Sequence, residues 1–272
     1  MVRNLAMLIG AAFVVVLGWA LIGSVRGVIS DPAVVTAAEQ LHLHPKDVTF
    51  ASDGWFGKFD KRQLQRGLLV YEKVCANCHS LSHVAFRNLT DLGYNEGQVK
   101  KYAAGWSAKQ PVQDPKTGVW GDRPNTPADY FPKVNYPGQG NPPDLSLITK
   151  ARHDGPAYVY SLLTGYQEQS AAVLKQFPDV KSPNGTYYNP YFANLNIAMP
   201  PPLTSDGQVP YLDGTRSTVD QNARDVAAFL TWAAEPKLEA RHNAGFVSVL
   251  FLLIFCFLSY GAYQNVWRDK EH

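Results

Sequence analysis

The five residues from Cys75 to His79 constrain this chain more than any other stretch. Two cysteines lie three positions apart in Cys75-Ala76-Asn77-Cys78-His79, and a histidine follows directly. Side chains at positions i and i+3 of a helical turn share a face, so both thiols can reach one planar macrocycle and form thioethers with it. The imidazole of His79 then lies where an axial ligand binds the iron. The motif therefore predicts one covalently bound haem c.

Two other uses of paired cysteines fit the surroundings less well. A structural zinc site needs four ligands, and the third cysteine, Cys256, lies far away in an apolar run. A thioredoxin-like pair follows a strand in a βαβ unit, whereas the residues before Cys75 have helical spacing.

The second axial position of a haem iron decides its use, because a closed position suits electron transfer and an open one suits catalysis. The methionines are Met1, Met7 and Met199, and the first two lie in the N-terminal apolar segment. Three prolines after Met199 favour a stiff, extended backbone that holds a thioether at little ordering cost. Met199 is therefore the predicted second ligand, and the alternative is an apolar gap-filler.

Histidines are the other candidates for this position. His153 is the main rival, whereas His83 is too close in sequence to His79 to reach the opposite face easily. His42 and His44 alternate before a proline, which is more typical of surface residues than of ligands.

Two apolar runs predict membrane segments. Residues 5–22 and 245–263 carry no charge, and each is near the ~20 residues that cross a bilayer core. Tyr260, Tyr263 and Trp267 with Arg268 and Lys270 close the second run, so we expect a transmembrane helix with a cytoplasmic C-terminus. The first run is either a retained anchor or a secretory signal, and the lack of an obvious cleavage pattern favours the anchor.

The chain is accordingly divided into four parts. Residues 1–27 form an anchor or signal segment, 28–242 an exported haem domain, 243–266 the transmembrane helix and 267–272 a cytoplasmic tail. The 25 Lys and Arg nearly balance the 23 Asp and Glu, which argues against a nucleic-acid binder.

Helical spacing predicts a mostly α fold. Helices are expected at 61–75, at 90–105, at 144–165 in two pieces with Asp154 as N-cap, and at 219–234 with Thr218 as cap. Gly67 on the first helix predicts a close crossing that Phe229 and Trp232 of the last helix would fill. Eight prolines between residues 106 and 143 exclude a long helix there and predict a long ordered loop.

Charged residues supply two further predictions. Arg152 offers a guanidinium that matches a haem propionate, although a solvated arginine at a helix end explains it equally well. Residues 200–240 carry more acidic than basic side chains, which could steer a basic carrier or be ordinary solvated surface. The acidic residues are Asp206, Asp213, Asp220, Asp225, Glu235 and Glu239.

Several segments, in this order, resemble the bacterial cytochrome c1 family, the haem subunits of quinol–cytochrome c oxidoreductase. They are Gln65-Arg66-Gly67 through His79-Ser80-Leu81, Phe86-Arg87-Asn88-Leu89, Pro142-Pro143-Asp144-Leu145-Ser146, Lys150-Ala151-Arg152-His153, Tyr160-Ser161-Leu162-Leu163-Thr164-Gly165-Tyr166, Tyr188-Asn189-Pro190-Tyr191-Phe192 and Ala198-Met199-Pro200-Pro201.

The resemblance implies a cytochrome c-type fold in which Cys75 and Cys78 attach the haem and His79 and Met199 are its axial ligands. It places Arg152 and Tyr158 near a propionate. It also implies a haem domain on the periplasmic side of the bacterial inner membrane that passes single electrons from the Rieske iron–sulfur protein to cytochrome c, within a dimeric complex containing cytochrome b. The subunit itself would be a redox carrier with no substrate-converting site.

One departure limits the resemblance. The family usually carries Asn-Asn-Gly-Ala before Pro-Pro-Asp, but this chain has the shorter Gly138-Gln139-Gly140-Asn141. The resemblance therefore does not extend to a haem-edge contact from that loop. Two alternative functions also stay open, namely a membrane-tethered carrier that works without a complex and a haem enzyme or sensor with an open iron position.

Overall fold

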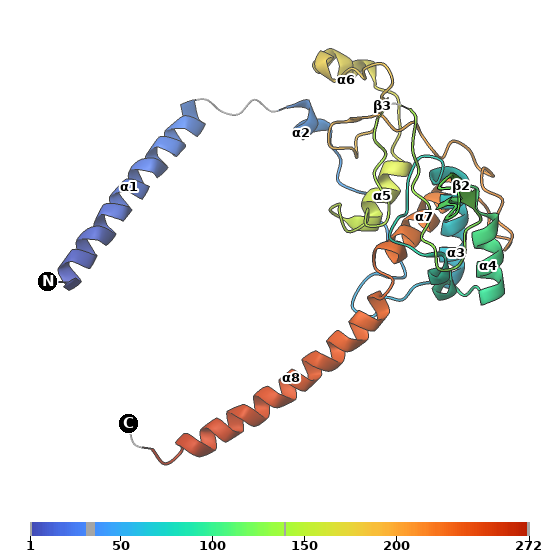
Figure 1. Ribbon diagram of the computed structural model, residues 1–272. Helices are drawn as coiled ribbons and strands as arrows, with labels where there is room; N and C mark the ends of the chain where they lie inside the picture. The colour runs from blue at the N-terminus through green and yellow to red at the C-terminus, as the bar shows by residue number, and fades with distance from the viewer. Residues whose placement is uncertain (1, 31–35, 139, 271–272) are drawn as a thin grey trace. The chain divides into compact units, whose positions relative to one another are not determined.

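The computed structural model describes residues 2–30, 36–138 and 140–270, so the expectations for Gln139 and the last two residues lie outside the described residues. The chain divides into two units, residues 1–42 and 43–272. The first unit contains α1 (Val2–Ser30) and the short α2 (Ala37–Leu41). The second contains the remaining elements, and helices form most of its regular structure (Figure 1).

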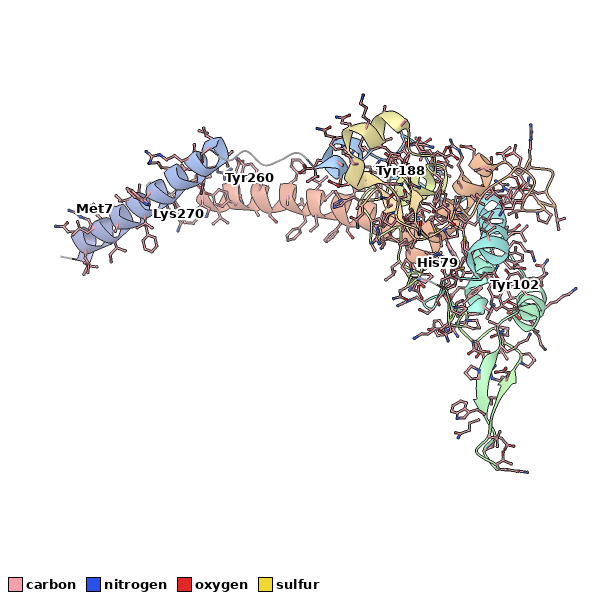
Figure 2. The ribbon with its side chains drawn as sticks, turned by 90° about the horizontal axis from the view of Figure 1, so that it is seen from above. Met7, His79, Tyr102, Tyr188, Tyr260 and Lys270 are labelled. Carbon is pink, nitrogen blue, oxygen red and sulfur yellow. The ribbon has the colours of Figure 1, made fainter. Side chains whose placement is uncertain are left out.

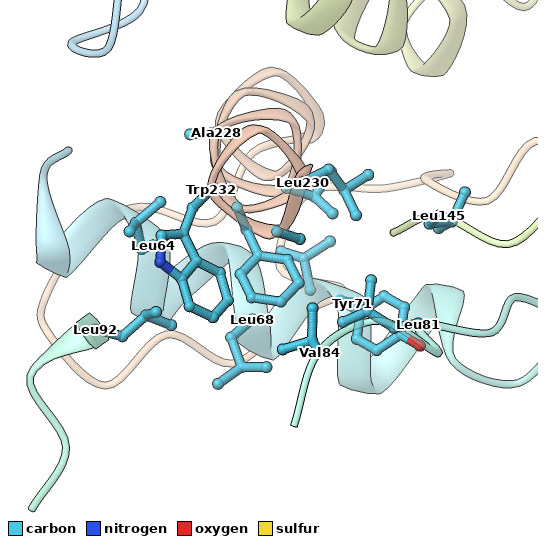
Figure 3. Close-up of a cluster of buried hydrophobic side chains, with 14 of the residues drawn as sticks. Leu64, Leu68, Tyr71, Leu81, Val84, Leu92, Leu145, Ala228, Leu230 and Trp232 are labelled. Carbon is cyan, nitrogen blue, oxygen red and sulfur yellow. The ribbon is translucent and has the colours of Figure 1, made fainter. Parts of the chain in front are cut away.

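The core of the second unit is the predicted crossing of α3 (Lys61–Val70) and α7 (Val219–Ala234). A Cβ atom added at Gly67 would lie 2.1 Å from the carbonyl oxygen of Asp225 and 2.6 Å from Cβ of Phe229. Glycine therefore lets the two helices approach closely, and the neighbours at this point are Phe229 and the backbone of Asp225. Trp232 is buried in the same core, beside Leu64 and Leu68 (Figure 3).

Both helices begin where their capping residues predict. The Asp60 carboxylate accepts hydrogen bonds from the backbone N–H groups of Arg62 and Gln63, and the Thr218 hydroxyl accepts one from Gln221. The predicted helix at 61–75 is confirmed with one refinement. After Val70 the chain widens into a π-helical turn, Tyr71–Cys75, which leads directly into the cysteine pair.

The helix expected at 90–105 is wrong in its first part. The structure has a 3-10 helix at Phe86–Leu92 and then α4 at Glu96–Gly105. Gly93 separates them with a φ of 96°, a conformation that ends a helix and that glycine adopts without strain. Asn95 then forms a reciprocal capping box with Gln98, so α4 has its own start.

The helix expected at 144–165 is also only partly correct. Turns occupy residues 145–154, and the single helix is α5 (Gly155–Leu163). Asp154 precedes it as predicted, but its φ is 58° and its side chain makes no capping hydrogen bond. Pro156 in the first turn remains a consistent start signal, because a first-turn residue has no intrahelical N–H bond to lose.

The proline-rich loops contain short structure that the composition did not indicate. A hairpin pairs β1 (Gln110–Gln113) with β2 (Trp120–Arg123), antiparallel from Gln110 opposite Arg123 to Gln113 opposite Trp120. Further on lie α6 (Ala171–Gln176), a 3-10 turn at Pro178–Val180, and the two-residue strands β3 (Tyr187–Tyr188) and β4 (Asn196–Ile197), which pair antiparallel.

Two helices are long and apolar enough to cross a membrane, α1 and α8 (Leu238–Trp267). Each is longer than its apolar run in the sequence. Every described residue of α8 from Asn243 onward is exposed, including Phe251, Ile254 and Leu258. A continuous apolar surface of this size is unstable in water and fits a lipid environment.

Candidate haem-binding site

A cavity of about 680 Å³ lies beside the cysteine pair, within the range of about 300–1,000 Å³ that cofactor pockets occupy. Its walls come from the end of the π-helical turn, the loop at 140–148, α5 and the segment after β4, and α7 contributes Val226 and Leu230. The lining side chains are mostly apolar, as a site that buries a macrocycle and excludes water requires.

All six predicted site residues line this one cavity. They are Cys75, Cys78, His79, Arg152, Tyr158 and Met199. The cysteines share a single turn, since the N–H groups of Cys78 and His79 both donate to the carbonyl oxygen of Cys75, at 3.1 and 2.9 Å. Met199 lies 120 to 124 positions after the three residues of the cysteine–histidine motif, yet its thioether lines the same cavity as the two thiols and the imidazole. This set of side chains fits a haem of the c type.

The ring of His79 is oriented by a backbone carbonyl. Its Nδ1 lies 2.8 Å from the carbonyl oxygen of Pro143. A carbonyl oxygen only accepts hydrogen bonds, so Nδ1 carries the hydrogen and Nε2 keeps its lone pair. This is the usual arrangement of a metal-binding histidine, because the second hydrogen bond fixes both tautomer and ring orientation. Burial lowers the pKa of His79, which also favours the neutral ring.

The loop that supplies this carbonyl is fastened to the residues after His79. Leu145 donates its N–H to the carbonyl oxygen of Ser80 at 2.9 Å. The Asp144 carboxylate accepts from the backbone N–H of Ser82 at 3.0 Å and from its hydroxyl at 2.5 Å. Burial alone would raise the pKa of Asp144, but hydrogen bonds from Ser146 and Ser82 lower it, so this carboxylate stays ionised.

Met199 is positioned by a tyrosine from the end of α5. The hydroxyl of Tyr166 donates a hydrogen bond of 3.1 Å to the carbonyl oxygen of Met199. Burial raises the pKa of Tyr166, so the phenol remains a donor. The fully buried Asn189 supports the same region, since its side-chain N–H group donates to the carbonyl oxygen of Leu162 at 2.8 Å.

The pattern of the Cytochrome C1 family matches residues 50–270. This chain belongs to the cytochrome c1 family. Membership makes it a haem electron-transfer protein of a mostly helical fold, and together with its two long apolar helices it makes the protein membrane-anchored.

Individual relatives agree with the family match. Cytochrome c1 of Rhodospirillum rubrum is 39% identical over 252 residues, which cover 85% of this chain and 89% of the relative. The cytochrome b-c1 complex catalytic subunit of Candida albicans is 39% identical over 246 residues, 88% of this chain and 82% of that protein. Cytochrome b/c1 of Bradyrhizobium diazoefficiens is 46% identical over 242 residues, 80% of this chain but 35% of that longer relative.

The thiols of this cytochrome c1 family member do not suit the alternative uses. Burial raises the pKa of Cys75 to about 12, so the cavity does not stabilise the free thiolate that disulfide exchange requires. Among the described residues, no three His, Cys, Asp or Glu side chains are grouped to hold a metal ion. Cys256 is exposed on α8, and the element before Cys75 is helical.

Arg152 and Tyr158 both line the cavity, and their predicted role near a propionate stays a prediction. Arg152 is exposed and donates to the neighbouring carbonyl oxygen of Ala151 at 3.0 Å, and it forms no ion pair with any residue described. Gly140 and Asn141 of the shortened loop also line the cavity. The loop thus reaches the site despite its departure from the family pattern.

The rival histidines are elsewhere. His83 and His153 are exposed, and neither is among the residues that line the cavity. His42 and His44 are exposed as well. Met199, by contrast, lines the cavity together with Cys75, Cys78 and His79.

The acidic residues of 200–240 are engaged within the chain. Asp225 is fully buried and, with Asp213, pairs with Arg66. Asp220 pairs with Arg224, and Asp206 with Arg216. Glu235 pairs with Lys150 and Arg241, and Glu239 accepts the N–H of Phe59. This region thus offers little unpaired negative charge for steering a carrier.

Sequence reasoning missed the positioning residues around the site. Tyr166 and Asn189 belong to the segments that resemble the family, but no spacing marks them as partners of Met199 and α5. A weak signal existed, because a tyrosine or asparagine in an apolar segment needs a hydrogen-bond partner once it is buried.

Proposed function

We propose that this chain passes single electrons from the Rieske iron–sulfur protein to cytochrome c within quinol–cytochrome c oxidoreductase. Cys75 and Cys78 would hold one haem c through thioethers, and His79 and Met199 would bind its iron. When bound, the group supplies a one-electron redox centre. The observation that carries the proposal is the convergence of these four side chains on one apolar cavity.

The chain's own residues prepare the site for electron transfer. Pro143 fixes the ring of His79, and Tyr166 fixes the backbone of Met199. Two protein ligands held this firmly leave no open position for a substrate and change little with oxidation state. A thioether ligand also favours a higher reduction potential than a second imidazole would.

The assembly follows from the membrane helices and the family. Cytochrome b is the proposed partner of α8 in the bilayer, with the Rieske protein and cytochrome c meeting the haem domain, and the complex is proposed to be dimeric. Arg268 and Lys270 follow the apolar run, so the C-terminus would be cytoplasmic and the haem domain periplasmic in a bacterial inner membrane.

The ligand assignment is tested by Met199→Leu in the full chain. The wild-type protein should show the near-infrared sulfur-to-iron charge-transfer band when oxidised and should resist carbon monoxide when reduced. The variant should lose the band, bind carbon monoxide and show a lower midpoint potential. Met7→Leu is the matched control and should change none of these. A variant that keeps the band and the potential would disprove ligation by Met199.

Purification in mild detergent separates the proposed complex from a free tethered carrier. Cytochrome b and the Rieske protein should co-purify with the chain in constant ratio. If the chain is isolated alone under conditions that keep other membrane complexes intact, the tethered-carrier alternative is supported. Carbon monoxide binding to the wild-type protein would instead favour an enzyme or sensor with an open iron position.

A further inference from the structure

We propose that the turn at residues 51–58, here called the aromatic turn, binds the phospholipid surface beside α8 and thereby holds the haem domain against the membrane. Trp55 is 84% exposed and Phe56 is 75% exposed. This contact is separate from electron transfer and does not depend on the haem. It depends only on insertion of α8.

The backbone of the aromatic turn is held by hydrogen bonds. The N–H of Lys58 donates to the carbonyl oxygen of Ala51 at 2.8 Å and closes the turn. The Asp53 carboxylate accepts the N–H of Phe50 at 2.7 Å, and Phe50 is itself buried in the core. Because the backbone is already ordered, insertion of the rings into a lipid surface costs little additional conformational entropy.

Two contacts place the aromatic turn at the level where α8 becomes apolar. The N–H of Phe59 donates to the Glu239 carboxylate, in the first turn of α8, at 2.9 Å. The ring of Phe56 meets the ring of Phe246 edge to face, with centroids 5.9 Å apart. Phe246 is the second residue of the uncharged run 245–263, so Phe56 lies beside the point at which that run begins.

The chemistry of this position favours a bilayer interface as the occupant. Tryptophan and tyrosine concentrate where headgroups meet acyl chains, and interfacial segments bury phenylalanine at the same boundary. Tyr260, Tyr263 and Trp267 supply such residues near the other end of α8, and Trp55 and Phe56 would supply them at this end. Lys58 directly precedes Phe59, and Lys237 directly precedes α8. Both lysines are exposed, and their ammonium groups suit the phosphate groups of anionic lipid.

The test uses the full haem-loaded chain with Cys256→Ser and one new cysteine, Trp55→Cys, labelled with an environment-sensitive fluorophore. Vesicles contain phosphatidylcholine and phosphatidylglycerol, with or without bromine on the upper acyl chain. The matched control is Trp120→Cys on β2, a 67% exposed tryptophan in a hairpin that leaves the domain in a different direction from α8 (Figure 2). In a separate sample of the unsubstituted chain, a label on the native Cys256 reports a position within the membrane span.

Bromolipid should quench the label at position 55 about twofold more than the label at position 120, and aqueous iodide should show the opposite order. Ratios of quenching cancel the constant effect of the haem on each label. Quenching of the Cys256 label by bromolipid shows that α8 is inserted. If iodide then quenches the labels at positions 55 and 120 equally, the proposal is overturned. Protection of position 55 from both quenchers, appearing only in the assembled complex, would also overturn it, because a protein partner would then cover the aromatic turn.

Discussion

Met199 is the proposed second ligand of the haem iron, and a hydrogen bond from another segment holds its backbone in place. The donor is the hydroxyl of Tyr166, 3.1 Å from the Met199 carbonyl oxygen. Tyr166→Phe removes this bond and leaves the ring in place, which should weaken the hold on Met199 by about 0.5–1.5 kcal/mol. We expect a weaker sulfur-to-iron band and a carbon monoxide affinity raised by up to about tenfold.

Tyr187→Phe is the control for this prediction, because Tyr187 lies on β3 and is half-exposed. It should leave both readouts at wild-type values. If Tyr166→Phe also leaves the band and the carbon monoxide affinity unchanged, the hydrogen bond does not position Met199.

The residues of the candidate site could be predicted from sequence to the extent that their chemistry is rare. Two cysteines and a histidine within the five residues Cys75–His79 admit few uses, and a single methionine outside the N-terminal segment leaves one thioether to consider. Tyr166 could not be found this way, because tyrosines are numerous and only the fold shows which hydroxyl reaches the Met199 carbonyl. The carbonyl of Pro143 carries no sequence signal at all.

At the scale of elements, the crossing of α3 and α7 depends on the absence of a side chain at Gly67. Gly67→Ala would place a Cβ 2.1 Å from the Asp225 carbonyl oxygen, where backbone must shift. Overpacking of this kind costs about 1–3 kcal/mol, which outweighs the roughly 1 kcal/mol that alanine gains over glycine in a helix. We expect lower stability in denaturant unfolding followed by near-ultraviolet circular dichroism.

Gly105→Ala is the matched control, because Gly105 ends α4 and no heavy atom lies within 4 Å of its added Cβ. That variant should be as stable as the wild type or slightly more so. Equal stability of the two variants would show that the close approach at Gly67 does not limit the packing of the helices.

The same crossing carries a charge network that predicts sensitivity to acid. Hydrogen bonding to Arg66 lowers the pKa of Asp213 from 3.8 to about 2. A carboxyl group whose pKa is lower in the folded than in the unfolded state stabilises the folded protein. This stabilisation is complete above the unfolded-state pKa and is lost as the pH falls through the folded-state pKa. The free energy of unfolding should therefore fall between about pH 4 and pH 2, and by less in Asp213→Asn.

The acid slope of Asp213→Asn should not vanish, since hydrogen bonds from Arg123 also lower the pKa of Asp129. Asp122→Asn is the control, because Asp122 is exposed on the β1–β2 hairpin and has no ion pair among the residues described. An acid slope that Asp213→Asn and Asp122→Asn reduce equally would exclude the Arg66 network as its source.

Elements were predictable where a start signal, an apolar face and an end coincide. This holds for α7, with Thr218 before it, a buried face and Pro236 after it. It fails for the helix expected at 90–105, because a left-handed glycine at position 93 separates a 3-10 helix that ends at Leu92 from α4, which starts at Glu96. It fails again at 144–154, where turns held by hydrogen bonds to Ser80 and Ser82 replace a helix. Such tertiary contacts override local propensity.

At the scale of the whole molecule, α1 and α8 are the two described helices long and apolar enough to cross a membrane, and retention of α1 as an anchor is a prediction that truncation can test. A chain that ends after Leu238 lacks the span of α8 but keeps the buried core, because Leu238 is the only buried residue of that helix among those described. The haem domain should therefore fold and attach its cofactor. We expect the truncated protein to remain with membranes after carbonate extraction, because the 29-residue apolar helix α1 is predicted to be retained as an anchor.

Intact-mass measurement of the truncated and full-length chains decides how this result is interpreted. If α1 is retained, the truncated chain has a mass that includes the N-terminal residues, and no haem domain appears in the soluble fraction. The full-length chain stays in the membrane whether α1 is retained or cleaved. Release of the truncated domain into the soluble fraction, at a mass that lacks the apolar N-terminal run, would identify α1 as a cleaved signal. α8 would then be the helix that anchors the mature protein, and the aromatic turn beside it would be the second contact with the bilayer.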